Sequence, residues 1–377
     1  MRMLVVNWRC PKNPLAGGAE VYLQEIFSRM VSRGHHVTLL SERFSGAEPE
    51  EVIEGIRVIR AGGKFTFNFT AGRLVGRIAE SLEADVVIDD LNKIPFYSTW
   101  HTKRPVLAIL MHLFRGSIFH ETLPPMAAYV WMAETMIPLA YKRCRFAVLS
   151  ESSKQDTVKV GIDPDRITVI PPGTDFGQFS PDTTVPREPL VLHVGRLKRY
   201  KATDHLLQAA RLLRDRGVKF TTVIVGDGDD KPRLERLAAK LGLGEHVRFT
   251  GFVPEAEKVS WYRRAAVLVE NSVKEGWGLI VMEANACGTS VVVANSPGLR
   301  DSSKDGVNGL MYDCGDVPAL AGKLEKLLSD DALRNRLGQQ AIAWAKQWTW
   351  GGAAEAMERV VEQAVAEAGR AASNPGV

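Results

Sequence analysis

Residues Leu190–Lys201 read LVLHVGRLKRYK, an apolar run that ends at a glycine and is followed at once by a basic turn. A short run of apolar and β-branched residues bounded by glycine is typical of a buried strand. The spacing then predicts a helix from about Lys201 to Arg214 and another strand at Thr222–Val225. Strand, turn, helix and strand in this order are the unit from which a doubly wound parallel sheet is built.

The same alternation runs through most of the chain. It predicts a helix from Gly18 to Arg33, a helix that ends at Leu241, and a last helix from near Trp350 to about Ala368. The predicted strands before residue 190 are Met3–Asn7, Val37–Leu40, Val86–Ile88, Val106–Leu110, Phe146–Leu149 and Thr168–Ile170. Those after residue 225 are Val247–Thr250, Ala266–Val269, Ser290–Val293 and Gly309–Tyr312. The fold class is therefore α/β.

The length of 377 residues exceeds what one compact core usually holds. Turn-forming residues at Pro171–Gly173 and Ser180–Pro189 indicate a linker. We predict Rossmann-like domains at residues 1–172 and 173–348, and a C-terminal helix and tail at 349–377 that return toward the first domain. Two such domains are expected to face each other across a cleft, since ligands bind at the carboxyl ends of parallel strands.

Composition excludes several classes of protein. Hydrophobic residues make up 45% and charged residues 24%, as in ordinary soluble proteins. The formal charge of +4 is small and diffuse, so we expect no nucleic-acid partner. The four cysteines lack the spacing of a zinc site. Without a recognisable secretory signal or a bilayer-length apolar run, the chain is expected to be cytoplasmic.

Two glutamates frame the stretch Lys274–Glu283, KEGWGLIVME. Glu275 is predicted in a glycine-flanked loop, and Glu283 about two turns into the following helix. Gly276 and Gly278 let a ligand approach the backbone, and the start of a helix offers N–H donors and a positive dipole to a phosphate. The two carboxylates can accept hydrogen bonds from sugar hydroxyls at two separate points.

This spacing resembles the E-x7-E signature of glycosyltransferase family 4, a family of retaining enzymes with the GT-B fold. The resemblance extends from Asn7 to about Ala366. It implies transfer of a sugar from a nucleotide-diphosphate sugar to an acceptor hydroxyl, in polysaccharide, glycolipid or glycoside synthesis. It also implies that Glu275 contacts the donor sugar and Glu283 the ribose. Backbone groups facing the donor would then come from Gly276, Trp277, Gly278, Leu279 and Ile280.

The basic turn after Val194 is a second candidate. An Arg and a Lys where a strand ends can balance the charge of a diphosphate leaving group. The resemblance assigns these roles to Arg196 and Lys201. The family usually has glycine after this lysine, whereas this chain has Ala202.

Five further residues gain a role mainly through the resemblance. Gly17 and Gly18 would permit close approach of the donor to the first helix, and His112 would lie near the anomeric carbon. Gly228 and Val253 would lie near the nucleotide.

A metal or other cofactor is not expected. Asp227-Gly228-Asp229 matches the D-x-D string of Mg²⁺-dependent transferases. However, it follows a strand beside an Arg/Lys pair that can already balance the diphosphate, which favours a turn.

The acceptor is expected to bind the N-terminal domain. It is expected to be a carbohydrate, a lipid-linked molecule or a small molecule. Asp89, Asp90 and Asn92 could meet its hydroxyls or could cap a turn. Leu123–Arg145 is predicted as an apolar helix with a basic end, which fits either a core helix or peripheral contact with the inner face of the membrane. Alternatives to the transferase are a catalytically silent GT-B scaffold or regulatory subunit, and a GT-B nucleotide-sugar epimerase.

Overall fold

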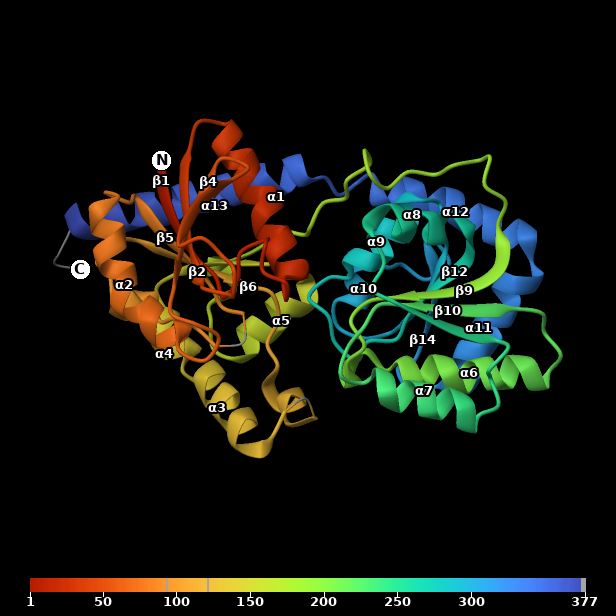
Figure 1. Cartoon of the computed structure of the whole chain (residues 1–377). Coiled ribbons are helices and arrows are strands. Elements are labelled where there is room, and N and C mark those ends of the chain that lie inside the picture. Colours follow the sequence, from red (N-terminus) through yellow and green to blue (C-terminus); the bar gives the residue numbers. More distant parts are fainter. Residues whose placement is uncertain (93, 121, 374–377) are drawn as a thin grey trace. The chain divides into compact units, whose positions relative to one another are not determined.

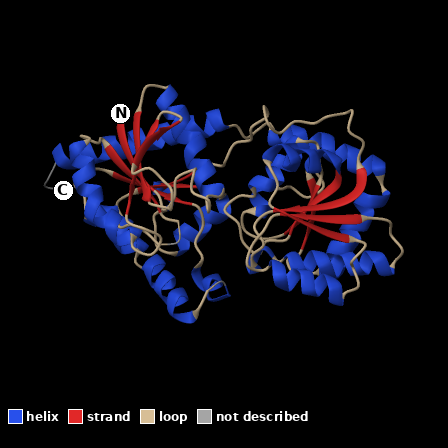
Figure 2. Ribbon diagram, in the orientation of Figure 1, coloured by secondary structure: helices blue, strands red, loops and turns tan. Residues whose placement is uncertain are grey.

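The structure is a computed structural model, and it describes residues 1–92, 94–120 and 122–373. The chain divides into two compact units (Figure 1). Unit 1 combines Met1–Gly173 with Trp350–Val377, and unit 2 comprises Thr174–Thr349. Within each unit, helices cover both faces of a central sheet (Figure 2).

In the described residues of unit 1, eight strands form one sheet in the order β3-β4-β2-β1-β5-β6-β7-β8. All neighbours are parallel except β3 and β4. The central strands are buried apolar runs, as expected where helices cover both faces. The strands are β1 (Arg2–Val6), β2 (His36–Glu42), β3 (Glu50–Ile53), β4 (Ile56–Ala61), β5 (Val86–Asp90), β6 (Val106–Leu110), β7 (Arg145–Val148) and β8 (Ile167–Val169).

The antiparallel edge formed by β3 and β4 was not predicted from the sequence. Glu54 and Gly55 join the strands with φ angles of 48° and 81°, which is the two-residue turn that suits the twist of a hairpin. Glutamate is an unusual residue at such a turn, and β3 is only partly buried. The usual sequence signals for a strand pair are therefore weak here.

The helices of unit 1 pack their apolar sides on this sheet. Phe67, Ala71 and Val75 of α2, for example, join Leu4 and Val6 of β1 in one buried core. The helical segments are α1 (Gly18–Ser32), α2 (Phe67–Ser81), η1 (Ser98–Trp100), η2 (Arg115–His120), α3 (Pro124–Thr135), α4 (Ile137–Tyr141), α5 (Glu151–Lys159), η3 (Pro164–Arg166) and α13 (Trp350–Ser373). Of the helices in the described ranges, none combines the length and apolarity needed to cross a bilayer.

The prediction of one helix over Leu123–Arg145 is wrong. The segment forms two helices, because α3 ends at Thr135 and α4 begins at Ile137. Pro138 lies in the first turn of α4, where its missing N–H does not interrupt a helix but cannot continue a preceding one. Lys142 and Arg143 are exposed in the turn after α4, and Arg145 already belongs to β7.

In the described residues of unit 2, six parallel strands form a sheet in the order β11-β10-β9-β12-β13-β14. The strands are β9 (Glu188–Val194), β10 (Thr221–Val225), β11 (Val247–Gly251), β12 (Ala265–Glu270), β13 (Val291–Ala294) and β14 (Gly309–Tyr312). The helical segments are η4 (Arg199–Lys201), α6 (Thr203–Asp215), α7 (Lys231–Lys240), α8 (Glu255–Arg264), α9 (Leu279–Ala286), α10 (Leu299–Ser302), α11 (Val317–Ser329) and α12 (Asp331–Ala345).

The predicted α/β class and the doubly wound parallel sheets are confirmed. Each strand predicted from the sequence is present, with ends that differ by at most two residues. The helix predicted from Lys201 begins at Thr203 instead, because Lys201 belongs to a 3₁₀ turn and Ala202 is left-handed. The last helix continues to Ser373 rather than ending near Ala368.

The last helix, α13, is tied to the start of the chain within unit 1. Arg33, at the end of α1, contacts Glu358 and Glu355 of α13 with Nη–Oε distances of 2.5 and 2.6 Å. His35 Nε2 lies 2.7 Å from the other oxygen of Glu358. These hydrogen bonds to His35 and Arg33 lower the pKa of Glu358.

We expect Glu358→Gln to lower the free energy of unfolding of unit 1 at pH 7 by about 1 kcal/mol, as is typical of a partly exposed charged pair. Because the folded-state pKa is depressed, the carboxylate contributes stability above its unfolded pKa near 4.3, and this is lost as the pH falls through the folded pKa. Urea unfolding at pH 7 and at about pH 3 should show a smaller difference at pH 3. Glu362→Gln, at an exposed position of α13, is the control. An equal loss at both pH values would contradict the prediction.

Candidate functional site

The loops that follow β9 and β12 lie side by side at the carboxyl edge of the unit 2 sheet. β9 and β12 are neighbours in the sheet. β10 and β11 follow β9 on one side, and β13 and β14 follow β12 on the other, so the strand order changes direction between β9 and β12. The backbone N–H of Val273, after β12, donates to the carbonyl of Tyr200, after β9, at 2.9 Å. Such a switch point is where open α/β sheets bind ligands.

Lys201 is buried in this region between two carboxylates. Its Nζ lies 2.7 Å from Glu275 Oε1 and 3.7 Å from Glu270 Oε2. Burial alone would lower the pKa of Lys201, but the attraction of Glu270 and Glu275 outweighs it and the pKa is raised. The ammonium is therefore charged at neutral pH, and the structure brings together the predicted pair Lys201 and Glu275.

Glu275 is held by its backbone as well as by Lys201. Its N–H donates to the carbonyl of Pro297 at 2.9 Å. Gly298 packs so closely that a Cβ there would lie 2.3 Å from the carbonyl oxygen of Glu275, and its φ of 83° also favours glycine. The start of α10 thus fixes the loop that presents Glu275.

The predicted glycine-rich segment forms a loop that leads directly into α9. Gly278 has a φ of 119° and precedes the helix, whose first residues are Leu279 and Ile280. The N–H groups of these two residues have no carbonyl partner within the helix by position, and they carry the positive end of its dipole. Gly276 precedes them in the loop, and the whole turn is able to receive an anion.

Trp277 has a different environment from the rest of this turn. Its side chain is only 4% exposed and contacts the ring of Trp348 edge-on, with centroids 5.1 Å apart. Trp344 packs on the same Trp348 ring. The side chain of Trp277 therefore packs in the interior of unit 2.

Glu283 is the fifth residue of α9, so it lies about one turn into the helix rather than two. Its Oε2 accepts a hydrogen bond from the hydroxyl of Tyr262 at 2.6 Å and lies 2.9 Å from Lys258 Nζ. Burial raises the pKa of Glu283, while Lys258 and Tyr262 act in the opposite direction. Both partners come from α8, so this helix holds the carboxylate in place.

Arg196 and Gly228 lie in two loops that support each other. Leu197 N–H donates to the carbonyl of Asp227 at 2.9 Å, and Gly195 N–H to that of Val225 at 3.0 Å. A Cβ on Gly228 would lie 2.2 Å from the carbonyl oxygen of Leu197. Gly228 therefore allows the turn after β10 to buttress the loop that carries Arg196, whose side chain is exposed.

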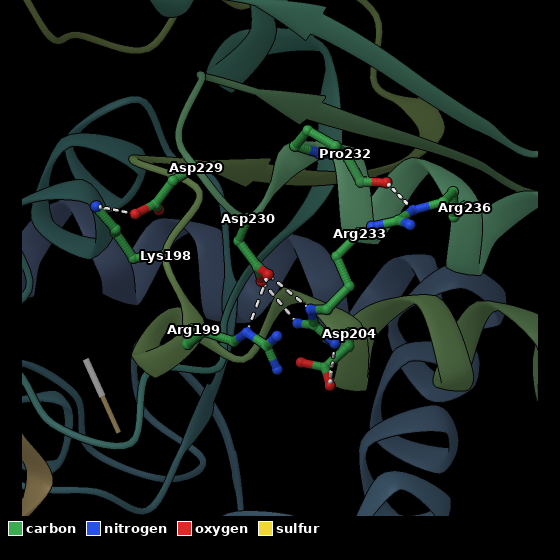
Figure 3. Close-up of polar contacts among 8 residues, drawn as sticks. All are labelled: Lys198, Arg199, Asp204, Asp229, Asp230, Pro232, Arg233 and Arg236. Carbon is green, nitrogen blue, oxygen red and sulfur yellow. Dashed lines mark hydrogen bonds and ion pairs between the residues drawn. The ribbon is translucent and has the colours of Figure 1, made fainter. Parts of the chain in front are cut away.

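The aspartates of the D-x-D string face cations of the protein. Asp229 pairs with Lys198 at 2.6 Å (Figure 3), and Asp227 Oδ2 lies 3.5 Å from Lys231 Nζ. The next residue, Asp230, receives two hydrogen bonds of 2.6 Å from Arg233 (Figure 3). Across residues 1–92, 94–120 and 122–373, no cluster of three potential metal ligands occurs.

Val253 is half-buried in the loop after β11, beside Phe252, which is 86% exposed. The backbone N–H of Gly226 donates to the carbonyl of Gly251 at 2.8 Å, so the loops after β10 and β11 are also joined. The predicted residues of unit 2 thus lie on the loops that follow β9, β10, β11 and β12 and in the first turns of α9.

Three predicted residues belong to unit 1. Gly17 precedes α1, where its N–H donates to Glu20 Oε2 at 2.6 Å, and Gly18 is the first residue of that helix. His112 follows β6, and its ring lies 4.7 Å from that of Phe114. All three follow the carboxyl ends of strands in the unit 1 sheet.

The two aspartates that end β5 have different environments. Asp89 Oδ2 accepts hydrogen bonds from Tyr141 at 2.6 Å and from the backbone of Ser98 at 3.0 Å. Asp90 is fully buried, and neither of its carboxylate oxygens has a partner among the described residues. Burial, together with the charges of Glu20 and Asp89, raises the pKa of Asp90 well above its usual value. Asp89 is therefore held in place through one of its oxygens, whereas both oxygens of Asp90 have unused hydrogen-bonding capacity.

Sequence reasoning missed Lys258, Tyr262 and Glu270. Lys258 and Tyr262 are four residues apart on α8, a spacing that places two side chains on one helix face. That spacing alone gives no reason to connect them with Glu283. Glu270 ends an otherwise apolar strand, and this was a signal that could have been used.

Comparison with known proteins places this arrangement among sugar-transferring enzymes. Residues 16–178 match the model described as Glycosyltransferase Family 4, and residues 178–344 match the model described as Glycosyl transferases group 1. A D-inositol 3-phosphate glycosyltransferase of Thermomonospora curvata is 30% identical over 89% of this chain and 88% of its own length. The corresponding protein of Frankia alni is 37% identical over 55% of each chain.

Solved structures show the same fold at lower identity. Sucrose-phosphate synthase from Thermosynechococcus elongatus superposes with a TM-score of 0.81 at 20% identity, covering 97% of this chain and 99% of its own. HepE of Anabaena in complex with UDP and glucose gives 0.76 at 18%, covering 96% and 100%. The predicted GT-B class, with two Rossmann-like domains, is confirmed.

Ala202 offers a test of how the Lys201 loop is built. It is left-handed, with a φ of 47°, which costs an L-residue about 1–2 kcal/mol. We expect Ala202→Gly to relieve this strain and, after the entropy that glycine loses on folding, to raise the free energy of unfolding of unit 2 by about 0.5–1 kcal/mol. Ala209→Gly, inside α6, should instead lower it by about 1 kcal/mol or more. Urea unfolding measures both, and a destabilised Ala202→Gly variant would show that the strain is absent.

Proposed function

Because this chain belongs to glycosyltransferase family 4, we propose that it is a retaining transferase that moves a sugar from a nucleotide-diphosphate sugar to an acceptor hydroxyl. The observation that carries the proposal is the contact of buried Lys201 with half-buried Glu275, 2.7 Å away, in the loop that leads into α9. A charged lysine and a carboxylate in this position suit the two ends of a sugar diphosphate, one anionic and one rich in hydroxyls.

The diphosphate is the part of the donor that unit 2 is best equipped to bind. Arg196 presents an exposed guanidinium, which can form paired hydrogen bonds to phosphate oxygens. Lys201 supplies a second positive charge, and the N–H groups of Leu279 and Ile280 add helix-end donors. These groups would stabilise the charge that grows on the leaving diphosphate during transfer, which is electrostatic catalysis.

The two glutamates would hold the two sugar rings. We assign Glu275 to hydroxyls of the transferred sugar, since it stands next to the proposed diphosphate cation. Glu283 is assigned to the ribose hydroxyls, with Lys258 and Tyr262 keeping its carboxylate in place. The base would contact the backbone near Val253.

Retention of anomeric configuration belongs to the same proposal. The acceptor oxygen would bond to the anomeric carbon on the face from which the diphosphate leaves, while the bond from that carbon to the diphosphate oxygen breaks. The acceptor proton would pass to the leaving phosphate oxygen. His112 is assigned a positioning and electrostatic role near the anomeric carbon.

No metal takes part in this scheme. The support is that Asp227, Asp229 and Asp230 are each engaged with a lysine or arginine of the protein. Arg196 and Lys201 would balance the diphosphate in place of a divalent cation.

The acceptor is assigned to unit 1 and to the class of polyols, sugars or hydroxyl-bearing lipids. The name of the Thermomonospora curvata relative makes D-inositol 3-phosphate one acceptor to assay. Gly17 and Gly18 would let the donor approach the start of α1.

Peripheral membrane contact and a cytoplasmic location remain predictions. Membrane contact is supported by apolar side chains of α3 and α4 that stay exposed, namely Met126, Met132 and Leu139. The neighbouring Lys142 and Arg143 would suit an anionic lipid surface.

The donor site can be tested by titrating UDP, GDP, ADP and dTDP into the protein, in EDTA and again in Mg²⁺. We expect one nucleotide to bind and to raise the melting temperature, equally with and without Mg²⁺. Glu283→Gln should weaken this nucleotide about tenfold, the effect of losing a charge-assisted hydrogen bond of about 1.4 kcal/mol. Calorimetry gives both affinities.

Glu245→Gln is the matched control, since Glu245 is exposed just before the amino end of β11. It should bind as the unmodified protein does. Binding only with Mg²⁺ would overturn the metal-independent scheme. A failure of all four nucleotides would favour the silent scaffold over the transferase.

A further inference from the structure

Glu270 is a buried carboxylate in a place where the fold does not need one. It ends β12, whose other residues are alanine, valine and leucine, and it is 1% exposed. β12 lies between β9 and β13 in the unit 2 sheet. Burying a charge there is costly unless partners compensate for the lost water.

The partners of Glu270 lead directly to the proposed diphosphate cation. Ser272 Oγ donates to Glu270 Oε1 at 2.7 Å, and Lys201 Nζ lies 3.7 Å from Oε2. Lys201 also contacts Glu275 at the shorter distance of 2.7 Å. One ammonium is therefore shared by two carboxylates, and Glu270 is the more distant of the two.

The other groups near Glu270 do not neutralise it. His193 Nδ1 lies 3.1 Å from the carbonyl of Val269 and its Nε2 lies 3.2 Å from Thr203 Oγ1. Burial lowers the pKa of His193, so it stays uncharged at neutral pH. The hydroxyl of Tyr312 donates to Asn271, and burial raises the pKa of Tyr312. The charges of Lys201, Glu270 and Glu275 therefore leave a net negative balance beneath the proposed diphosphate.

We propose that Glu270 is a positioning residue that weakens the hold of Lys201 on the diphosphate and so promotes release of the nucleoside diphosphate product; this rests on the proposed function. A bound diphosphate has to share Lys201 with both carboxylates, and it is repelled by the buried charge of Glu270 in a region of low dielectric. Glu275 cannot serve this purpose, because it is assigned to the sugar.

The repulsion acts more strongly on product than on donor. A nucleotide sugar carries about two negative charges, whereas a nucleoside diphosphate with a free terminal phosphate approaches three at neutral pH. The carboxylate of Glu270 therefore penalises the product more, after the sugar has left. Lys201 can therefore attract the diphosphate strongly enough to stabilise it as a leaving group and still release it as product.

The test is the affinity of Glu270→Gln for UDP, GDP, ADP and dTDP, measured by calorimetry beside the unmodified protein. We expect the diphosphate that binds the unmodified protein to bind the variant about tenfold more tightly, or 1.4 kcal/mol. The monophosphate should gain less and the uncharged nucleoside nothing. We also expect the turnover rate of the variant to fall, because product release becomes slower. A purely structural role would instead weaken the binding of the diphosphate, the monophosphate and the nucleoside alike.

Ser272→Ala is the comparison variant, because it removes a hydrogen bond to the same carboxylate but keeps the charge. It should show no tightening. Glu270→Leu carries the same expectation as Glu270→Gln and serves if the glutamine variant does not fold. An unchanged or weaker affinity in a folded variant would overturn the proposed role of Glu270 and leave the proposed function standing. If the unmodified protein binds none of the nucleotides, the proposed function falls, and this role with it.

Discussion

A buried ammonium held between two carboxylates is the interaction on which the candidate site depends. Lys201 stays charged only because Glu275 and Glu270 outweigh the cost of its burial. The same contacts fix the direction of Glu275, so cation and acid are placed together before any ligand arrives. Preorganised charge of this kind is worth more than the same groups in water, because no solvent has to reorganise during the reaction.

The parallel sheet of unit 2 explains why these residues meet. Lys201 follows β9, whereas Glu270 and Glu275 follow from β12, and the two strands are neighbours at the switch point. Glycines then allow the loops to approach. Gly298 lies against the backbone of Glu275, and Gly228 lies against that of Leu197. The chemistry is thus built on loop backbones whose positions are fixed by close packing.

The sequence predicted the sheets well, because strands buried on both faces are continuous apolar runs such as Val106–Leu110. It also predicted the loop that leads into α9, where glycine spacing and helix onset agree. The β3–β4 hairpin was missed because its turn contains Glu54 and its edge is partly exposed. The contacts of Glu270 with Lys201 and of Lys258 with Glu283 were missed because these partners are distant in sequence, and only tertiary structure brings them together. The burial of the Trp277 ring depends likewise on Trp348, contributed by the segment after α12.

The most direct measurement is a crystal structure of the chain with the nucleoside diphosphate that stabilises it. We expect a phosphate oxygen within hydrogen-bonding distance of Lys201 Nζ and the ribose hydroxyls beside Glu283. Phosphates bound elsewhere, with Lys201 still contacting only Glu275 and Glu270, would contradict it.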